Sequence, residues 1–190
     1  MNQQESINII KDMIDNSRQN IKDQSPYYLW WGSLVFLAAL VEYILFVFME
    51  SPHHWWVWPV MSILGGVGSG IIGWRQEKRA TVKTFIDRAM NYVWGGWIMI
   101  FIITIIWAAV SGLSWAQIFT IIIAFYGVGT FISGGILRFK PLLVGGLISL
   151  FIAVLCILLQ LDQNFANMLI ALALSILVSY LIPGFLLRKA

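Results

Sequence analysis

The sequence carries little charge. Only 11% of its 190 residues are Asp, Glu, Lys or Arg, whereas soluble globular domains average about 25%. Hydrophobic residues make up 59% of the chain, and they gather in runs of about 20 residues, the length that crosses the apolar core of a bilayer. These features exclude an ordinary soluble domain and predict an integral membrane protein in contact with the lipid bilayer.

The chain also lacks the residues of the common catalytic and metal centres. Its one cysteine, Cys156, lies in an apolar run, which excludes a disulfide framework. The sequence contains none of the HExxH, GxSxG, Walker A or paired-cysteine motifs that carry zinc, acyl-transfer, phosphate or redox chemistry. The net charge of +3 fits the topology signals of a membrane protein. We therefore expect a non-catalytic protein without cofactor, metal or nucleic acid.

Six apolar segments are long enough to span a membrane. They cover about residues 27–49, 55–74, 91–110, 115–137, 141–161 and 165–187. We expect an all-α fold in which 26–190 forms a six-helix transmembrane domain. A cytosolic amphipathic helix is expected over 1–25, where isoleucines share one face, and a cytosolic linker helix over 75–90.

A repeat of glycine and arginine divides the six spans into three hairpins. The same 43 residues separate the members of each pair, which are Gly32 and Arg75, Gly95 and Arg138, and Gly145 and Arg188. This spacing predicts three tandem parallel hairpin repeats, related by rotation about the membrane normal or arranged in an arc.

Positive charge is confined to one end of this six-span plan. Lysine and arginine occur in the N-terminal segment, in 75–90, in 138–140 and at the C-terminus, and the turns near 50–54, 111–114 and 162–164 have none. Because positive residues stay in the cytoplasm, we expect a multi-pass protein of a bacterial inner membrane with both termini in the cytoplasm.

Glycines on several spans have the spacing of close helix packing. They are Gly65, Gly66, Gly70 and Gly73 on the second span, Gly129 and Gly134 on the fourth, and Gly145 on the fifth. Small residues let two backbones approach where no hydrophobic effect drives helices together. The run 65–73 lacks the Lys-Ser/Thr that ends a phosphate-binding loop, so we interpret it as a packing surface.

Glu42 is the acidic residue that the six-span plan places inside a span. With no lysine or arginine at that depth, a buried carboxyl should be partly or wholly protonated. Glu42 could handle a proton or a cation, or it could be a structural group bonded to a neighbouring helix, with Tyr126 and Thr104 as candidate partners. The equivalent positions in the repeat, Ile105 and Leu155, are apolar, which favours a special role for Glu42.

Two polar clusters lie outside the spans. His53, His54 and Glu50 could hold a metal ion, but adjacent histidines diverge, and a solvated turn fits better. The basic residues of the linker could bind anionic lipid headgroups or simply set the topology. They are Arg75, Lys78, Arg79 and Lys83.

Three short runs follow the polar, isoleucine-spaced N-terminus. They are Tyr27-Tyr28-Leu29-Trp30-Trp31-Gly32, Asp87-Arg88 and Trp94-Gly95-Gly96. This pattern resembles a family of uncharacterised small bacterial six-helix inner-membrane proteins, and the resemblance implies no activity and no site residue. Mitochondrial carriers also have three two-helix repeats, but their Pro-x-Asp/Glu-x-x-Lys/Arg signature is absent.

Two functions stay open. The first is an accessory, sensor or assembly module that acts through its cytosolic helices on a cytosolic protein partner or on a second copy of the chain. The second is a small transporter or channel with Glu42 as its proton- or cation-handling group. The scarcity of polar residues inside the spans favours the first.

Overall fold

The computed structural model describes residues 22–78 and 85–189 of the chain. Its helices are α2 (Ser25–Val47), α3 (Val57–Glu77), α4 (Phe85–Ser111), α5 (Trp115–Ile136), α6 (Lys140–Leu158), α7 (Phe165–Ile176) and α8 (Ile182–Lys189). Two 3₁₀ turns, His54–Trp56 and Leu161–Gln163, precede α3 and α7. A π-helical segment, η3 (Leu177–Leu181), joins α7 to α8. The part of the chain described is all-helical, as the sequence predicts.

Six helices within the described residues are long and apolar enough to cross a membrane. They are Ser25–Val47, His54–Glu77, Phe85–Ser111, Trp115–Ile136, Lys140–Leu158 and Phe165–Lys189. This confirms the prediction of six helices of spanning length and apolar composition, which indicate a multi-pass membrane protein. Residues 75–77 belong to α3 and 85–90 to α4, so the described parts of the expected linker helix continue the neighbouring spans. The rest of that linker and the predicted N-terminal helix lie outside the described residues.

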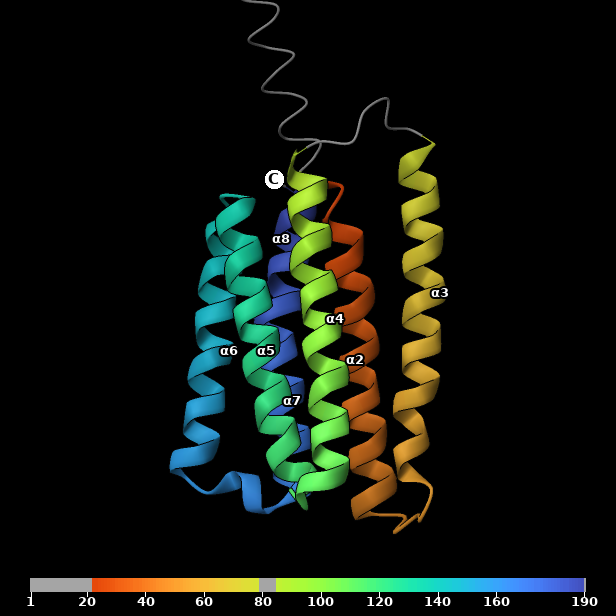
Figure 1. Ribbon diagram of the computed structural model, residues 1–190, viewed down its shortest axis with the longest axis vertical. Coiled ribbons are helices and arrows are strands. Elements are labelled where there is room, and N and C mark those ends of the chain that lie inside the picture. Colours follow the sequence, from red (N-terminus) through yellow and green to blue (C-terminus); the bar gives the residue numbers. More distant parts are fainter. Residues whose placement is uncertain (1–21, 79–84, 190) are drawn as a thin grey trace, which may run out of the picture.

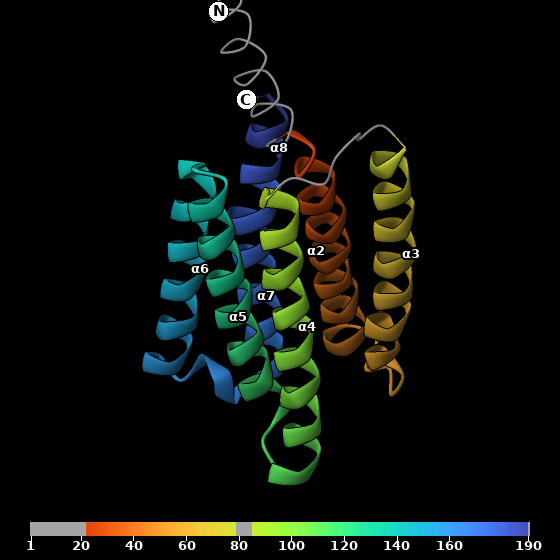
Figure 2. The same cartoon turned by 45° about the horizontal axis from the view of Figure 1, so that its top comes forward.

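The helices form a bundle with a dense centre and two peripheral members. α7 contacts α2, α5 and α6, and the closest helix pair is α5 with α6. α4 packs mainly on α5, and α3 packs mainly on α2. Figures 1 and 2 show α3 set apart on one side of the bundle, with α2 as its neighbour.

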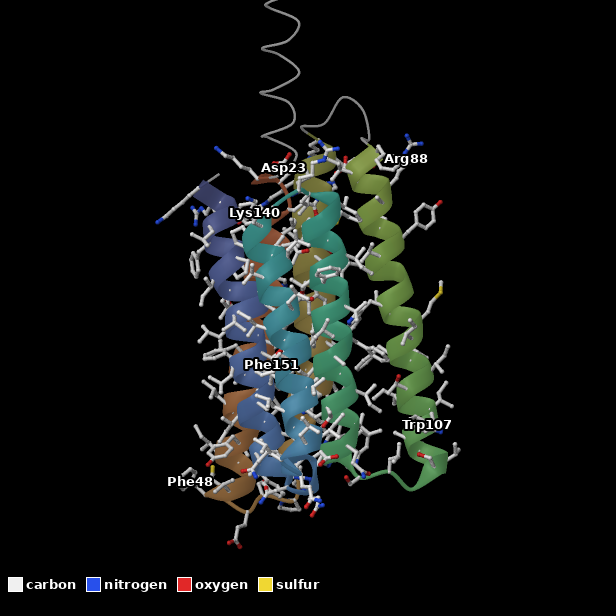
Figure 3. All side chains as sticks on the ribbon, turned by 90° about the vertical axis from the view of Figure 1, so that its left-hand side faces the viewer. Asp23, Phe48, Arg88, Trp107, Lys140 and Phe151 are labelled. Carbon is white, nitrogen blue, oxygen red and sulfur yellow. The ribbon has the colours of Figure 1, made fainter. Side chains whose placement is uncertain are left out.

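The bundle has two ends of different character. Arg88, Lys140 and Asp23 lie at one end, and Phe48 and Trp107 lie at the other (Figure 3). We call the first the basic end, after its lysines and arginines. The helices α2, α4 and α6 begin there, and α3, α5 and α8 finish there. The opposite end, with the turns after α2, α4 and α6, is the far end. The described lysines and arginines share the basic end, as the six-span plan requires.

The hairpin pairs α2–α3, α4–α5 and α6–α7 are each in contact, but they are not equally buried. Most of α5 is enclosed, whereas most of α3 is exposed, although the repeat gives both the same place in a hairpin. Threefold symmetry therefore stays a prediction.

Glycine permits the closest helix approaches at α6. A Cβ atom on Gly134 of α5 would lie 2.6 Å from the Leu143 amide nitrogen, and one on Gly145 would lie 2.5 Å from the Val178 carbonyl oxygen. Both distances are below van der Waals contact, so only glycine fits. The predicted packing role of these two glycines is correct.

The other predicted packing glycines behave differently. Gly65, Gly73 and Gly129 face the aromatic side chains of Trp31, Tyr27 and Trp94 rather than a backbone. A Cβ atom on Gly66 or Gly70 would meet nothing within 4 Å. For these two glycines the packing role stays a prediction, because the described chain leaves that face of α3 open.

Substituting these glycines separates the two groups. Gly145→Ala should lower the free energy of unfolding by about 1–3 kcal/mol, because the new methyl group is forced against a backbone. Gly66→Ala should leave stability unchanged or raise it by up to about 1 kcal/mol through higher helix propensity. Thermal unfolding in detergent measures both, and equal effects at the two positions would contradict the packing described here.

Candidate functional site

The site forms where the chain reverses after α2. Glu42 lies on the last turns of α2 and is only 1% exposed. The turn that follows is closed by a hydrogen bond from the Ser51 amide to the Leu45 carbonyl, 3.0 Å, and it passes through Glu50 with φ of 46°. This reversal brings His54 and Trp58, four residues apart, back against α2.

Both oxygens of the Glu42 carboxyl group are bonded. His54 Nδ1 lies 2.8 Å from Oε1, and the Trp58 indole N–H donates to Oε2. We call these three residues the Glu42 clasp. One proton lies between Oε1 and Nδ1, held either by the imidazole against a carboxylate or by the acid against a neutral imidazole. In either arrangement the clasp joins α2 to the start of α3.

The partners expected from the sequence are not the ones found. Thr104 donates instead to the Ile100 carbonyl in its own helix, 2.9 Å. Tyr126 packs against Trp97, with ring centroids 4.9 Å apart. Neither belongs to the clasp. The partner that Glu42 has instead, His54, belongs to the following turn and not to a span at the depth of Glu42.

Aromatic rings enclose the clasp on the side of the bundle. Phe46 and Phe165 lie against His54, with centroids 5.1 and 5.7 Å away. Phe119 of α5 lies 5.2 Å from the Trp58 ring. These apolar surroundings lower the local dielectric and strengthen the hydrogen bonds inside them.

Within the ion pair, His54 is the more exposed partner, and it lies in the turn at the far end. The His54 side chain is 23% exposed, against 1% for Glu42. His53 is exposed, so the predicted solvated turn is correct for His53 and wrong for His54. Within the described residues, no group of three or more His, Cys, Asp or Glu side chains is arranged to hold a metal ion.

Beside the clasp, α2 and α3 are separated by an apolar groove of about 400 Å³. Leu37, Val41 and Leu45 form one wall, and Val60 and Leu64 form the other. The groove occupies the half of the hairpin nearer the far end. In this half, the apolar contacts of α3 with the bundle come from Met61, which is buried, and from Val57 and Trp58, which pack against the core.

Nearer the basic end, indoles tie the same two helices together. The Trp30 N–H donates to the Gly65 carbonyl, 3.3 Å, and the Trp31 N–H donates to Ser69 Oγ, 2.8 Å. The indole rings occupy the space that the missing side chains of Gly65 and Gly68 leave open. Tryptophan on α2 and glycine on α3 are therefore complementary.

A second polar cluster is buried between α2, α4, α5 and η3. In the described part of the chain, the hydroxyl groups of Tyr28, Thr130 and Tyr180 and the indole N–H of Trp97 are buried without a partner in full hydrogen-bond geometry, and Thr130 is the polar neighbour of the Tyr180 hydroxyl. Tyr180 is in ring contact with both Tyr28 and Tyr126, at 5.3 Å in each case. The sequence analysis selected Tyr126 from this cluster and missed Tyr28 and Tyr180. Both tyrosines place a hydroxyl group inside an apolar run, and this feature of the sequence could have identified them.

The predicted lipid-binding residues are only partly described. Arg75 and Lys78 are exposed at the end of α3, and Lys78 Nζ lies 3.6 Å from the centroid of the Trp74 ring, a cation–π contact. Arg79 and Lys83 lie outside the described residues. Headgroup binding stays a prediction.

Adjacent histidines allow a matched test of the clasp. His54→Ala should lower the free energy of unfolding by about 1–3 kcal/mol, because Glu42 Oε1 is left buried without a partner. His53→Ala should change it by less than about 0.5 kcal/mol, as expected for an exposed position. Thermal unfolding in detergent compares the two, and an equal loss at both positions would contradict the assignment.

Hydroxyl deletions test the tyrosine cluster. Tyr180→Phe should leave stability unchanged or raise it, because it removes a buried hydroxyl group that has no partner. Ser149→Ala should lower stability by about 1 kcal/mol, because Ser149 Oγ donates to the Ile123 carbonyl, 3.1 Å, and lies 2.5 Å from Ser175 Oγ. A loss for Tyr180→Phe as large as that for Ser149→Ala would show that the Tyr180 hydroxyl is bonded.

Comparison with known proteins gives no match for this chain. No protein-family model, no curated protein and no solved structure matches the chain. The resemblance to small bacterial inner-membrane proteins therefore stays a prediction, and the function is argued from the clasp and its surroundings.

Proposed function

We propose that this chain is a non-catalytic integral membrane protein, an accessory, sensor or assembly module, and not a transporter. The observation that carries the proposal is the burial and internal bonding of the Glu42 carboxyl group. Its carboxyl group is 1% exposed, and both oxygens are bonded within the chain, to His54 and to Trp58. A group that binds a transported ion needs free coordination and an aqueous path. Glu42 instead joins two helices.

Other buried polar groups support the same conclusion. Ser25 Oγ donates to the Gly184 carbonyl at 2.8 Å, Ser133 Oγ to the Gly129 carbonyl at 2.7 Å, and Ser179 Oγ to the Ser175 carbonyl at 2.7 Å. The Ser25 bond joins the start of α2 to α8, the other two bonds lie within one helical segment, and all three hydroxyl donors are satisfied inside the chain.

Transport through Glu42 is the alternative function. The access of solvent to Glu42 favours the non-transporting module instead. His54 connects Glu42 with solvent at the far end. Towards the basic end, the same side of α2 carries Val35, Ala38 and Ala39, which are 1%, 5% and 0% exposed. An ion at Glu42 would therefore have access from one end only, whereas transport requires access from both.

The basic end is where such a module would meet its partner. Positive residues favour the cytoplasmic side, so we place this end in the cytoplasm. α3 finishes and α4 begins there, and the predicted amphipathic helix over 1–25 precedes α2 at the same end. A cytosolic protein or a second copy could bind these segments. The peripheral position of α3 allows it to shift without rebuilding the centre of the bundle.

Flux measurements test the proposal. Proteoliposomes containing the full chain should show no proton, Na⁺ or K⁺ flux above that of empty vesicles, and Glu42→Gln should behave identically, because Glu42 is engaged within the chain. Flux that is present in the wild type and lost in Glu42→Gln would refute the proposal. In cells, a chain lacking residues 1–22 should insert normally and behave as a loss-of-function allele.

A further inference from the structure

We propose that the Glu42 clasp is a proton-binding switch: protons that arrive from the far end open it and release the adjoining half of α3 from the bundle. This inference rests on the proposed function, since it names what the module senses. It follows from four features: how α3 is held, how solvent reaches the clasp, how the pair takes up protons, and where α3 can bend.

α3 is held differently along its length. In the half nearer the far end, the clasp supplies the side-chain hydrogen bonds to α2, and the apolar groove of about 400 Å³ keeps the two helices apart beside it. In the half nearer the basic end, Trp30 and Trp31 donate to Gly65 and Ser69. Opening the clasp would therefore leave one half of α3 held only by the apolar packing of Val57 and Met61, while the other half keeps its hydrogen bonds to α2.

His54 gives protons their access to the clasp. The His54 imidazole is 23% exposed and touches the Glu42 carboxyl group, which is 1% exposed. The rings of Phe46, Phe119 and Phe165 contact the clasp from α2, α5 and α7, and the side chains that act electrostatically on Glu42 are His54 and Trp58. Among these described contacts, no third titratable group faces the pair. His53 and Glu50 of the same turn are exposed and remain in solvent.

The direction of the switch follows from the proton count. With no proton on the carboxyl group, either neutral or charged His54 can donate from Nδ1 to Oε1. With one proton shared by the pair, the contact persists. When both groups are protonated, His54 Nδ1–H bonds to a neutral carboxyl oxygen, so the charge-assisted bond is lost, and the imidazolium charge has lost its carboxylate. The clasp is therefore closed at neutral and alkaline pH and opens on acidification.

The doubly protonated pair requires both groups to have taken up a proton, so the switch responds to acid and not to alkali. Distances are therefore compared at about pH 7.5 and at about pH 5.

Glycines provide the place where α3 can bend. Gly65 and Gly66 lie where the half of α3 held by the clasp meets the half held by Trp30 and Trp31, and Gly68 and Gly70 follow within the second half. Gly66 and Gly70 have no packing neighbour within 4 Å of an added Cβ atom, so the packing of the described chain does not explain them. Glycine weakens a helix interior, which makes this segment the hinge between the fixed half and the released half.

Distances between spin labels on the full chain in lipid nanodiscs test the switch. In a Cys156→Ser background, labels replace Ile63 of α3 and Leu158 of α6, which are 66% and 71% exposed. The single neutral-pH distance peak should be lost at about pH 5. A second pair, at Ile71 and Val144 near the basic end, should give the same distance at both pH values.

Three variants identify the group that responds. Glu42→Gln and His54→Gln each remove one titrating partner, and both should abolish the response to pH. His53→Gln is the matched control and should respond like the wild type. If Glu42→Gln does not fold, His54→Gln, which alters a partly exposed residue, carries the test. An unchanged wild-type distance, or a full response in both clasp variants, would overturn the switch.

The outcome is separable from the test of the proposed function. No response to pH together with no ion flux removes the switch and leaves a non-transporting module. Flux that depends on Glu42 removes the proposed function, and the switch with it, whatever distances the labels report.

Discussion

The requirement that a buried carboxyl group be bonded on both oxygens organises the far end of this protein. Inside an apolar bundle, water is not available to satisfy such a group, so the chain must supply donors. His54 and Trp58 do so, and they reach Glu42 only because the turn after α2 folds them back. The position of α3, the exposure of His54 and the enclosing aromatic rings all follow from this arrangement.

Two kinds of packing divide the bundle. Where α6 meets α5 and η3, glycine lets backbones touch, and Ser149 bonds to Ser175 across the interface at 2.5 Å. Between α2 and α3, by contrast, tryptophan rings separate the helices and a groove remains. Backbone contact produces a stiff centre, because no flexible side chain lies between the helices. Indole spacers produce a peripheral arm that is held at discrete points, and this contrast makes α3 the element suited to move.

The sequence analysis identified Glu42 correctly as unusual but assigned it the wrong partners. Its depth in α2 is visible as a position in an apolar run, and so is the absence of lysine and arginine nearby. His54 looked like an ordinary loop residue, because sequence position does not reveal how tightly a turn folds back. Gly66 and Gly134 show the same difficulty. Both are glycines in apolar spans, yet one faces open space and the other faces Leu143 of α6.

By itself, the sequence determined the six spans, their alternating direction and the gathering of the described basic residues at one end. These properties depend on runs of apolar residues and on where charge falls between them, and both are local. The tertiary structure decided which helices are central, which glycines face a neighbour and which side chains meet Glu42. Those outcomes depend on the rotation of each helix about its axis and on the geometry of the turns. They come from packing between segments far apart in the chain, which local sequence does not encode.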